Sequence, residues 1–371
     1  MIKILFHIDS LFSGGAEKVM CDLVNNLNPN IFDITVQTLF PEKSDQFLSP
    51  HIRYRYIYPK NERFYYGLYR LEAALGLVYP LHMKDDYDIE VAYLECGPTK
   101  VIAASTNRKA KKIAWVHCDF AVAFGLDFVK KTRRYYQKFD RVVCVSEQCK
   151  KSFDHLFGEG FKTIVVHNVI DSEAIKARSI EALPCAAKKR KFTLCACGRF
   201  SPPKNYKRLL ETVKQLRNNG FDFDLWILGD GEQRVMVEQI VANDQLEECV
   251  TLFGFQSNPY PFMREADLLV CSSNYEGFST FITEGLILGK PIVTTECSGM
   301  RELLGDSDFG IVTKNDDRDF CLQLKKLLLA NNQILLQLGE KSSERGKDFS
   351  MSKLVSENEL FLKTVILDED T

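Results

Sequence analysis

Residues 267–295 read DLLVCSSNYEGFSTFITEGLILGKPIVTT and change their apolar pattern twice. The run Asp267–Cys271 is short and almost wholly apolar, which is typical of a buried parallel strand, and the polar residues after it end the strand. Helical spacing begins at Thr280, and a second strand is expected at Pro291–Thr295. Glu276 therefore lies in the loop at the carboxyl end of a strand and Glu284 in the first turns of the next helix. Open α/β sheets bind their ligands at this place.

Two carboxylates at such a loop can accept hydrogen bonds from neighbouring hydroxyls of a ribose or a sugar, while free helix N–H groups hold a diphosphate. The spacing of Glu276 and Glu284 resembles the E-x7-E signature of the retaining glycosyltransferases of family 4. This resemblance implies a nucleotide-sugar donor, with Gly277, Phe278 and Ser279 beside the sugar and diphosphate. Two glutamates at this spacing also occur on solvated helix faces, so the assignment depends on motifs elsewhere in the chain.

Residues 192–216 read FTLCACGRFSPPKNYKRLLETVKQL, a strand that leads through a loop into an amphipathic helix. The loop carries Arg199 and Lys204. Arginine offers a planar fork of donors and lysine a compact charge, a combination suited to a diphosphate, although a solvated basic loop would have the same residues. The resemblance makes both residues phosphate ligands. It also places the loop that begins at Gly254 near the nucleotide base.

The N-terminal part of the chain begins with an expected strand at Met1–Ile8 and continues through SGGAEK into a helix. Gly14 and Gly15 at a helix start let the backbone approach an anion. The match of this loop to family 4 implies contact with the donor phosphates. His117 follows another expected strand, and the resemblance assigns it to the donor sugar, with Asp119 as a weaker candidate. A histidine in such a place is as often a structural residue.

Apolar strand-like runs alternate with amphipathic helical stretches along all 371 residues, which predicts two doubly wound α/β domains. The resemblance names this architecture the GT-B fold, two Rossmann-like domains facing across a cleft. We expect an N-terminal acceptor-side domain at 1–171, a linker at 172–190, a C-terminal donor domain at 191–348, and a helix at 349–371 that crosses back to the first domain.

The twelve cysteines lie mostly inside apolar strands and form no C-x-x-C pair, so neither disulfides nor a structural metal are expected. With no recognisable signal peptide or membrane anchor, the sequence predicts a cytoplasmic protein. The resemblance implies a reaction that needs no metal or other cofactor. A net charge of −2 argues against nucleic-acid binding.

Basic residues are concentrated in two places. Between His51 and Arg70 they alternate with tyrosines and Phe64, and between Arg108 and Lys151 they outnumber acidic residues. Cations mixed with aromatic rings suit an anionic membrane surface. The alternative is a tyrosine-rich helix packed on its own domain with its cations in water.

These features together predict a retaining glycosyltransferase that moves a sugar from a nucleotide sugar, with UDP the commoner nucleotide, to a saccharide acceptor. Relatives of this type extend lipid-linked saccharides in surface-polysaccharide biosynthesis, which favours a polyprenyl-linked acceptor. A nucleotide-sugar epimerase of the same fold and a non-catalytic partner subunit are the alternatives. A nicotinamide oxidoreductase is disfavoured because the first strand is not followed by G-x-G-x-x-G.

Overall fold

The structure is a computed structural model that describes residues 1–11, 14–184 and 191–367. These residues form two compact units. The first comprises Met1–Ile170 together with the residues from Ser352 onward, and the second comprises Asp171–Met351. The final part of the predicted linker and the two residues before Gly14 lie outside the described residues.

A parallel sheet lies at the centre of each unit. In the described residues the first sheet runs in the order β3 (Arg53–Tyr56), β2 (Phe32–Thr38), β1 (Ile2–His7), β4 (Ile89–Ala92), β5 (Lys111–Val116), β6 (Arg141–Cys144) and β7 (Thr163–Val165). The second runs in the order β10 (Val250–Gly254), β9 (Asp224–Leu228), β8 (Thr193–Cys197), β11 (Leu268–Cys271), β12 (Ile292–Thr295) and β13 (Ile311–Thr313). Both orders reverse beside the first strand of the unit, between β1 and β4 and between β8 and β11. The prediction of two doubly wound α/β domains is therefore confirmed.

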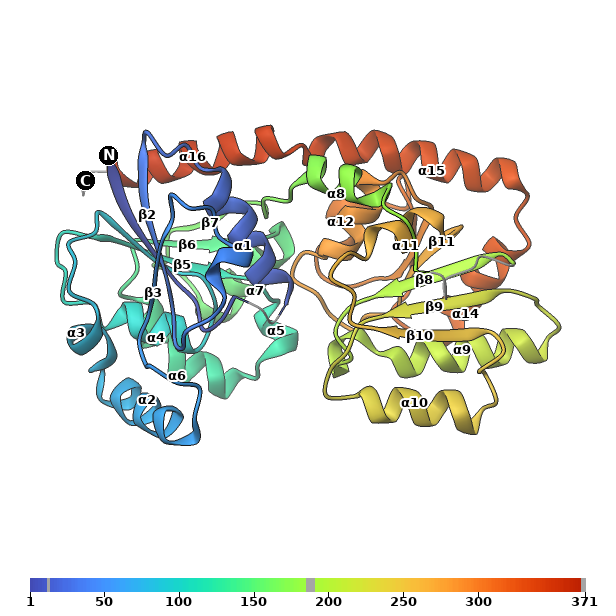
Figure 1. The fold of residues 1–371 in the computed structure, drawn as a ribbon, viewed down its shortest axis with the longest axis horizontal. Coiled ribbons are helices and arrows are strands. Elements are labelled where there is room, and N and C mark those ends of the chain that lie inside the picture. The colour runs from blue at the N-terminus through green and yellow to red at the C-terminus, as the bar shows by residue number, and fades with distance from the viewer. Residues whose placement is uncertain (12–13, 185–190, 368–371) are drawn as a thin grey trace. The chain divides into compact units, whose positions relative to one another are not determined.

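Helices cover both faces of each sheet (Figure 1). Those of the first unit are α1 (Gly15–Asn26), α2 (Arg63–Leu75), α3 (Val78–His82), α4 (Gly97–Ala103), α5 (Phe120–Ala123), α6 (Leu126–Tyr136), α7 (Glu147–Phe157) and most of α16 (Met351–Leu367). Those of the second are α8 (Ser172–Ser179), α9 (Tyr206–Asn218), α10 (Arg234–Asn243), α11 (Tyr260–Glu265), α12 (Thr280–Ile287), α13 (Met300–Leu304), α14 (Asp317–Leu328) and α15 (Asn332–Gly346). Single 3₁₀ turns lie at Ser44–Gln46, Pro202–Lys204 and Lys347–Phe349. In the second unit α9, α10 and α14 lie on one face of the sheet, and α8, α11, α12 and α15 on the other (Figure 1).

Apolar burial explains why the central strands form. All residues of β11 and β12 are buried, as expected of parallel strands covered on both faces. The core between this sheet and α9 includes Leu209, Phe223 and Ile227, each fully buried. Since full burial of such a side chain stabilises the fold by about 1.5–3 kcal/mol, this packing fixes the ends of β8 and β11, from which the site loops extend.

Several element boundaries differ from the sequence-based expectation for local reasons. The first helix starts at Gly15 rather than near Val19, with Glu17 in its first turn. The first residues of the predicted linker form α8, where the Asp171 carboxylate accepts a hydrogen bond from the Ala174 backbone N–H at 2.8 Å and caps the helix. The C-terminal helix begins at Met351 after a 3₁₀ turn rather than at residue 349.

Candidate active site

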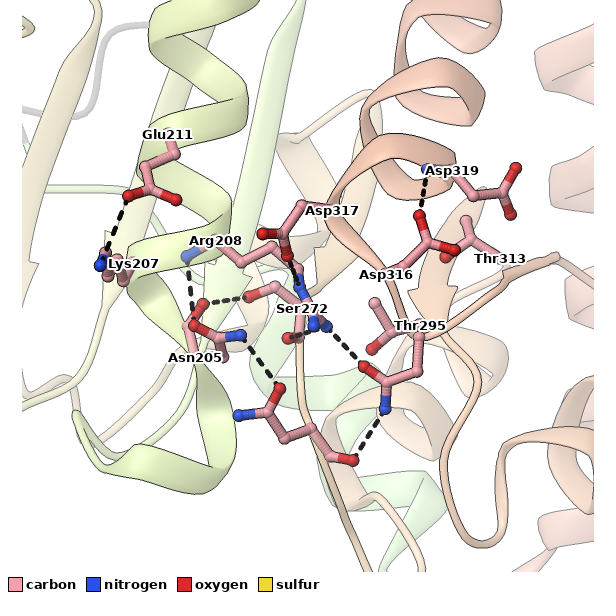
Figure 2. Close-up of polar contacts among 12 residues, drawn as sticks. Asn205, Lys207, Arg208, Glu211, Ser272, Thr295, Thr313, Asp316, Asp317 and Asp319 are labelled. Carbon is pink, nitrogen blue, oxygen red and sulfur yellow. Dashed lines mark hydrogen bonds and ion pairs between the residues drawn. The ribbon is translucent and has the colours of Figure 1, made fainter.

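The loop after β8 carries Arg199 and Lys204, as the sequence predicted. Asn205 stands at φ +46° and ends this loop by accepting a hydrogen bond from the Arg208 N–H at 3.2 Å, so it caps α9 (Figure 2). The neighbouring turn after β9 packs directly on the loop. A Cβ at Gly229 would lie 1.9 Å from the Gly198 carbonyl oxygen, so only glycine fits there.

The loop after β11 brings Glu276 to Lys204. Their side chains form an ion pair of 2.6 Å between Nζ and Oε1, and the Ser273 hydroxyl donates to the same carboxylate oxygen at 2.7 Å. The two side chains are 26% and 11% exposed, so solvent screens the pair only partly. Because β8 and β11 are the strands beside the topological reversal, the pair lies where a doubly wound sheet binds its ligand.

The electrostatic environment keeps Lys204 positively charged. Burial acts to lower the pKa of its ammonium group, but the Glu276 carboxylate and its other contacts outweigh this effect and raise the pKa above the usual value. Burial, followed by the charge of Glu276, raises the pKa of the Cys271 and Cys297 thiols nearby, so both remain protonated and neutral. Lys204 is therefore a fixed cation beside the Glu276 carboxylate.

The start of α12 presents donors that an anion could use. Gly277, Phe278 and Ser279 are buried just before this helix, and the Ser279 hydroxyl is a buried polar atom with no hydrogen-bond partner among the described residues. Buried hydroxyls normally have partners, so this one is available to bind a ligand of the site. Gly299, at φ +79°, packs closely against this segment. A Cβ at this position would lie 2.7 Å from the Gly277 carbonyl oxygen, so a larger residue would not fit.

The remaining second-unit candidates differ in their surroundings. Glu284 is buried in α12 and accepts a hydrogen bond from the Tyr260 hydroxyl at 3.3 Å. Arg199 is exposed, and its guanidinium contacts no described side chain or carbonyl closely enough for a hydrogen bond. Gly254 ends β10 at φ +67° beside open space, and its carbonyl accepts from the Gly229 N–H at 2.8 Å. The positive φ by itself favours glycine at this position, and the contact of its loop with the nucleotide base stays a prediction.

The first-unit candidates lie at the carboxyl ends of strands β1 and β5. Gly14 is the N-cap of α1 and Gly15 its first residue. His117 follows β5, with its ring 4.8 Å from that of Tyr93 and its Nε2 buried without a hydrogen-bond partner in the described part of the chain. Burial lowers the pKa of His117 to about 3, and a hydrogen bond to the Tyr93 backbone offsets only part of this. His117 is thus a neutral imidazole at physiological pH.

Two acidic residues near His117 have structural partners. The weaker candidate Asp119 caps α5, and its Oδ1 accepts hydrogen bonds from the Ala121 N–H at 2.9 Å and from the Ser152 hydroxyl at 2.5 Å. This capping role accounts for Asp119 without a ligand. Glu95, which sequence reasoning missed, accepts hydrogen bonds from the backbone N–H groups of His117 and Cys118.

Comparison with known proteins identifies the family. Residues 13–174 match the model described as Glycosyltransferase Family 4, and residues 191–330 match the model described as Glycosyl transferases group 1. The chain belongs to the family 4 glycosyltransferases. The predicted family is confirmed by these matches, which cover both units.

Two of the curated relatives are named as transferases of glycan biosynthesis. It is 32% identical over 194 residues to an N-acetylgalactosamine-N,N'-diacetylbacillosaminyl-diphospho-undecaprenol 4-alpha-N-acetylgalactosaminyltransferase of Campylobacter jejuni, covering 52% of this chain and 51% of that protein. It is 28% identical over 147 residues to the lipopolysaccharide core biosynthesis glycosyltransferase LpsE of Rhizobium meliloti, covering 40% of this chain and 42% of that one. These alignments span about half or less of the relatives' own length.

The solved structure of Anabaena HepE in complex with UDP-glucose confirms the fold. Its TM-score to this glycosyltransferase is 0.78, at 19% identity, with 98% of this chain and 100% of that chain covered. Both units are thus Rossmann-like domains of the GT-B type. Over the described residues, no helix has the length and apolar character needed to cross a membrane.

Proposed function

We propose that the protein transfers a sugar from a UDP-sugar to a saccharide acceptor with retention of anomeric configuration, as part of cell-surface polysaccharide biosynthesis. The observation that carries the proposal is the Lys204–Glu276 pair at the reversal between β8 and β11, beside a helix start with the unpartnered Ser279 hydroxyl. A nucleotide sugar requires both a cation for its diphosphate and a carboxylate for its hydroxyls. The loops after β8 and β11 supply these two groups side by side.

The side chains divide between the parts of the donor. Arg199 and Lys204 bind the diphosphate with the N–H groups at the start of α12, Glu276 and the Gly277–Phe278 backbone bind the sugar hydroxyls, and Glu284 binds the ribose. The loop at Gly254 lies beside the base. Because the leaving group is a nucleoside diphosphate, stabilising its growing charge does most of the catalytic work, and these cations do so without a metal ion.

We propose that Gly14, Gly15 and His117 of the first unit are also ligands of the donor. His117, whose lowered pKa keeps it neutral, would serve as a hydrogen-bonding group to the sugar rather than as a cation. Retention is supported by family membership, and the UDP donor by the HepE complex with UDP-glucose.

The acceptor is proposed to be a polyprenyl-linked saccharide at the cytoplasmic face of the membrane. The name of the Campylobacter relative, which acts on an undecaprenol diphosphate, supports this choice. The outer face of α2 supports it physically. Phe64, Leu71 and Leu75 lie on one stripe of this helix and are 70%, 59% and 63% exposed, with exposed Arg63 and Arg70 beside them. An apolar stripe flanked by cations is typical of a helix that lies in a membrane interface.

The other charged residues of α2 and α6 favour binding to an anionic membrane surface. Glu72, within α2, points inward and accepts hydrogen bonds from the Tyr58 hydroxyl and the His82 ring, so it does not neutralise the outer face. Lys130 and Lys131 are exposed on α6. In Figure 1, α2, α4 and α6 lie on the same side of the first sheet. Basic groups on this side would add about 1 kcal/mol each near anionic lipid.

A donor panel tests the proposal. The pure protein is incubated with UDP-, GDP- and ADP-sugars, with and without EDTA, while its melting temperature and nucleotide release are followed. One UDP-sugar should raise the melting temperature, because ligand binding stabilises the folded state by mass action, and EDTA should leave the effect unchanged. Isomerisation of the donor without any acceptor, or no response to any nucleotide sugar, would contradict the proposal.

A further inference from the structure

Arg208 lies in the first turn of α9 and is only 7% exposed, although its side chain is charged. Its Nε donates to Oδ1 of Asp317 at 2.6 Å, and its Nη1 donates to Oδ1 of Asn315 at 2.7 Å and to the Ser272 carbonyl at 3.2 Å. Figure 2 shows Arg208 of α9, Ser272 just after β11 and Asp317 at the start of α14 converging. A buried guanidinium is costly unless its N–H groups are bonded, and here three contacts meet that requirement.

A second set of hydrogen bonds joins the same loops around Arg208. The Asn274 backbone carbonyl accepts from the Asn315 side-chain amide at 2.8 Å. The Asn274 backbone N–H donates to the Pro203 carbonyl at 2.7 Å. The Ser272 hydroxyl donates to the carbonyls of Lys204 and Asn205 at 3.0 and 3.1 Å. The loop that carries Lys204 and the loop that carries Glu276 are therefore tied to each other and to Arg208.

We propose that Arg208 is a positioning residue that sets the distance between Lys204 and Glu276 by holding their two loops together. The inference rests on the proposed function, in which these two side chains bind the donor, but the positioning itself concerns the fold of the second unit. Arg208 touches neither side chain. It acts through Ser272, four residues before Glu276, and through the N-terminus of α9, which directly follows Lys204.

The shape of the guanidinium is what the network requires. Its planar fork directs Nε to one partner and Nη1 to two others, whereas a lysine ammonium in the same place would be a single point of contact. Arg208→Lys would keep the charge and much of the side-chain volume while losing the fork. The remaining hydrogen bonds would then hold the two loops less tightly, and Lys204 and Glu276 would be at bonding distance for a smaller fraction of the time.

The test compares Arg208→Lys with a matched control on the same helix. Arg217, in the last turn of α9, bonds the Phe221 carbonyl and Asp222 and takes no part in this network, so Arg217→Lys makes the same chemical change elsewhere. Backbone hydrogen exchange is measured for segments 200–205 and 272–279, together with the melting temperature and the donor kcat/KM. Asn315→Ala is a second variant. It removes one hydrogen-bond acceptor of the Arg208 guanidinium and leaves Arg208 itself unchanged.

Arg208→Lys and Asn315→Ala should speed exchange in both segments by about tenfold, with unchanged exchange in β9 and β12, and should lower donor kcat/KM by about tenfold. Arg217→Lys should change neither. Unchanged exchange in the two segments, or a uniform rise across the whole second unit, would overturn the inference. If the wild type transfers no sugar, the proposed function fails, while the exchange measurement still decides the role of Arg208.

Discussion

Nζ of Lys204 lies 2.6 Å from Oε1 of Glu276, although 72 positions separate the two residues in the sequence. An ammonium group has three donors, so one remains bonded to Glu276 while the others are free for a diphosphate oxygen. The carboxylate in turn keeps its second oxygen for a sugar hydroxyl. Lys204 can therefore bind the diphosphate and Glu276 the sugar while the ion pair between them stays intact.

Loss of the cation should reduce donor use. Lys204→Ala removes a charge-assisted contact to the diphosphate and leaves Glu276 unpaired, so kcat/KM for the donor should fall roughly ten- to a hundredfold, equivalent to about 1.5–3 kcal/mol. Steady-state kinetics at limiting donor measures this. Lys207→Ala is the control, because Lys207 is exposed and its only ion pair within the described part of the chain is with Glu211 at 3.7 Å. Wild-type kinetics in Lys204→Ala would show that this loop does not bind the donor.

The two glutamates should affect different steps. Glu284→Gln should weaken the binding of free UDP, since its proposed partner is the ribose, whereas Glu276→Gln should leave UDP binding nearly intact and reduce transfer. Titration calorimetry with UDP, followed by transfer assays, separates the two effects. Equal losses of UDP affinity in both variants would rule out this division of roles.

Membrane contact should depend on charge and on the stripe of α2. The protein should bind vesicles of anionic lipid, ignore neutral vesicles and dissociate as the Debye length shrinks to about 3 Å near 1 M salt. Two variants should lose binding while keeping hydrolysis of the donor: the joint change of Arg63, Arg70, Lys130 and Lys131 to Glu, and the joint change of Leu71 and Leu75 to Ser.

A control for this experiment changes the same amount of charge on the second unit. Four of the exposed cations of that unit are replaced by Glu in this control: Lys207, Arg318, Lys341 and Lys347. Cosedimentation measures binding for all variants. If the α2 variants and this control pellet with vesicles as the wild type does, the stripe is an ordinary solvated surface and the acceptor is not presented by the membrane.

The neutral His117 should make stability depend on pH. Its folded pKa is about 3, below the usual 6.5, so the unfolded chain binds more protons between these values. The contribution of His117 is fully present above pH 6.5 and is lost as pH falls towards 3. Melting temperatures of the wild type should therefore fall more steeply between pH 7 and pH 4.5 than those of His117→Gln. Comparing the two proteins cancels the pH effect of Glu95, whose carboxylate both retain. Parallel curves would mean that His117 is not buried as a neutral ring.

Sequence reasoning identified the strands and the loops because their signals are local. The apolar run before Glu276 and the glycine-terminated strand before Arg199 are each readable within a few residues. Arg208 carried no such signal, since in YKRLLE it resembles any cation on a helix surface. Its partners Ser272 and Asp317 are 64 and 109 positions away, so its burial follows only from the sheet order. The contact of Asp119 with Ser152 was hidden for the same reason, because Ser152 lies on another helix.

The last helix determines when the first unit can finish folding. Phe361 of α16 packs its ring 6.2 Å from that of Trp115, and Glu359 accepts a hydrogen bond from the Asn28 N–H at 2.8 Å, so the first unit is built from both ends of the chain. Leu354 and Leu362 are buried in the same helix. During synthesis the second unit is complete in sequence before this helix leaves the ribosome. The first part of the chain is translated first, yet the packing of Phe361 on Trp115 can form only after α16 has been synthesised.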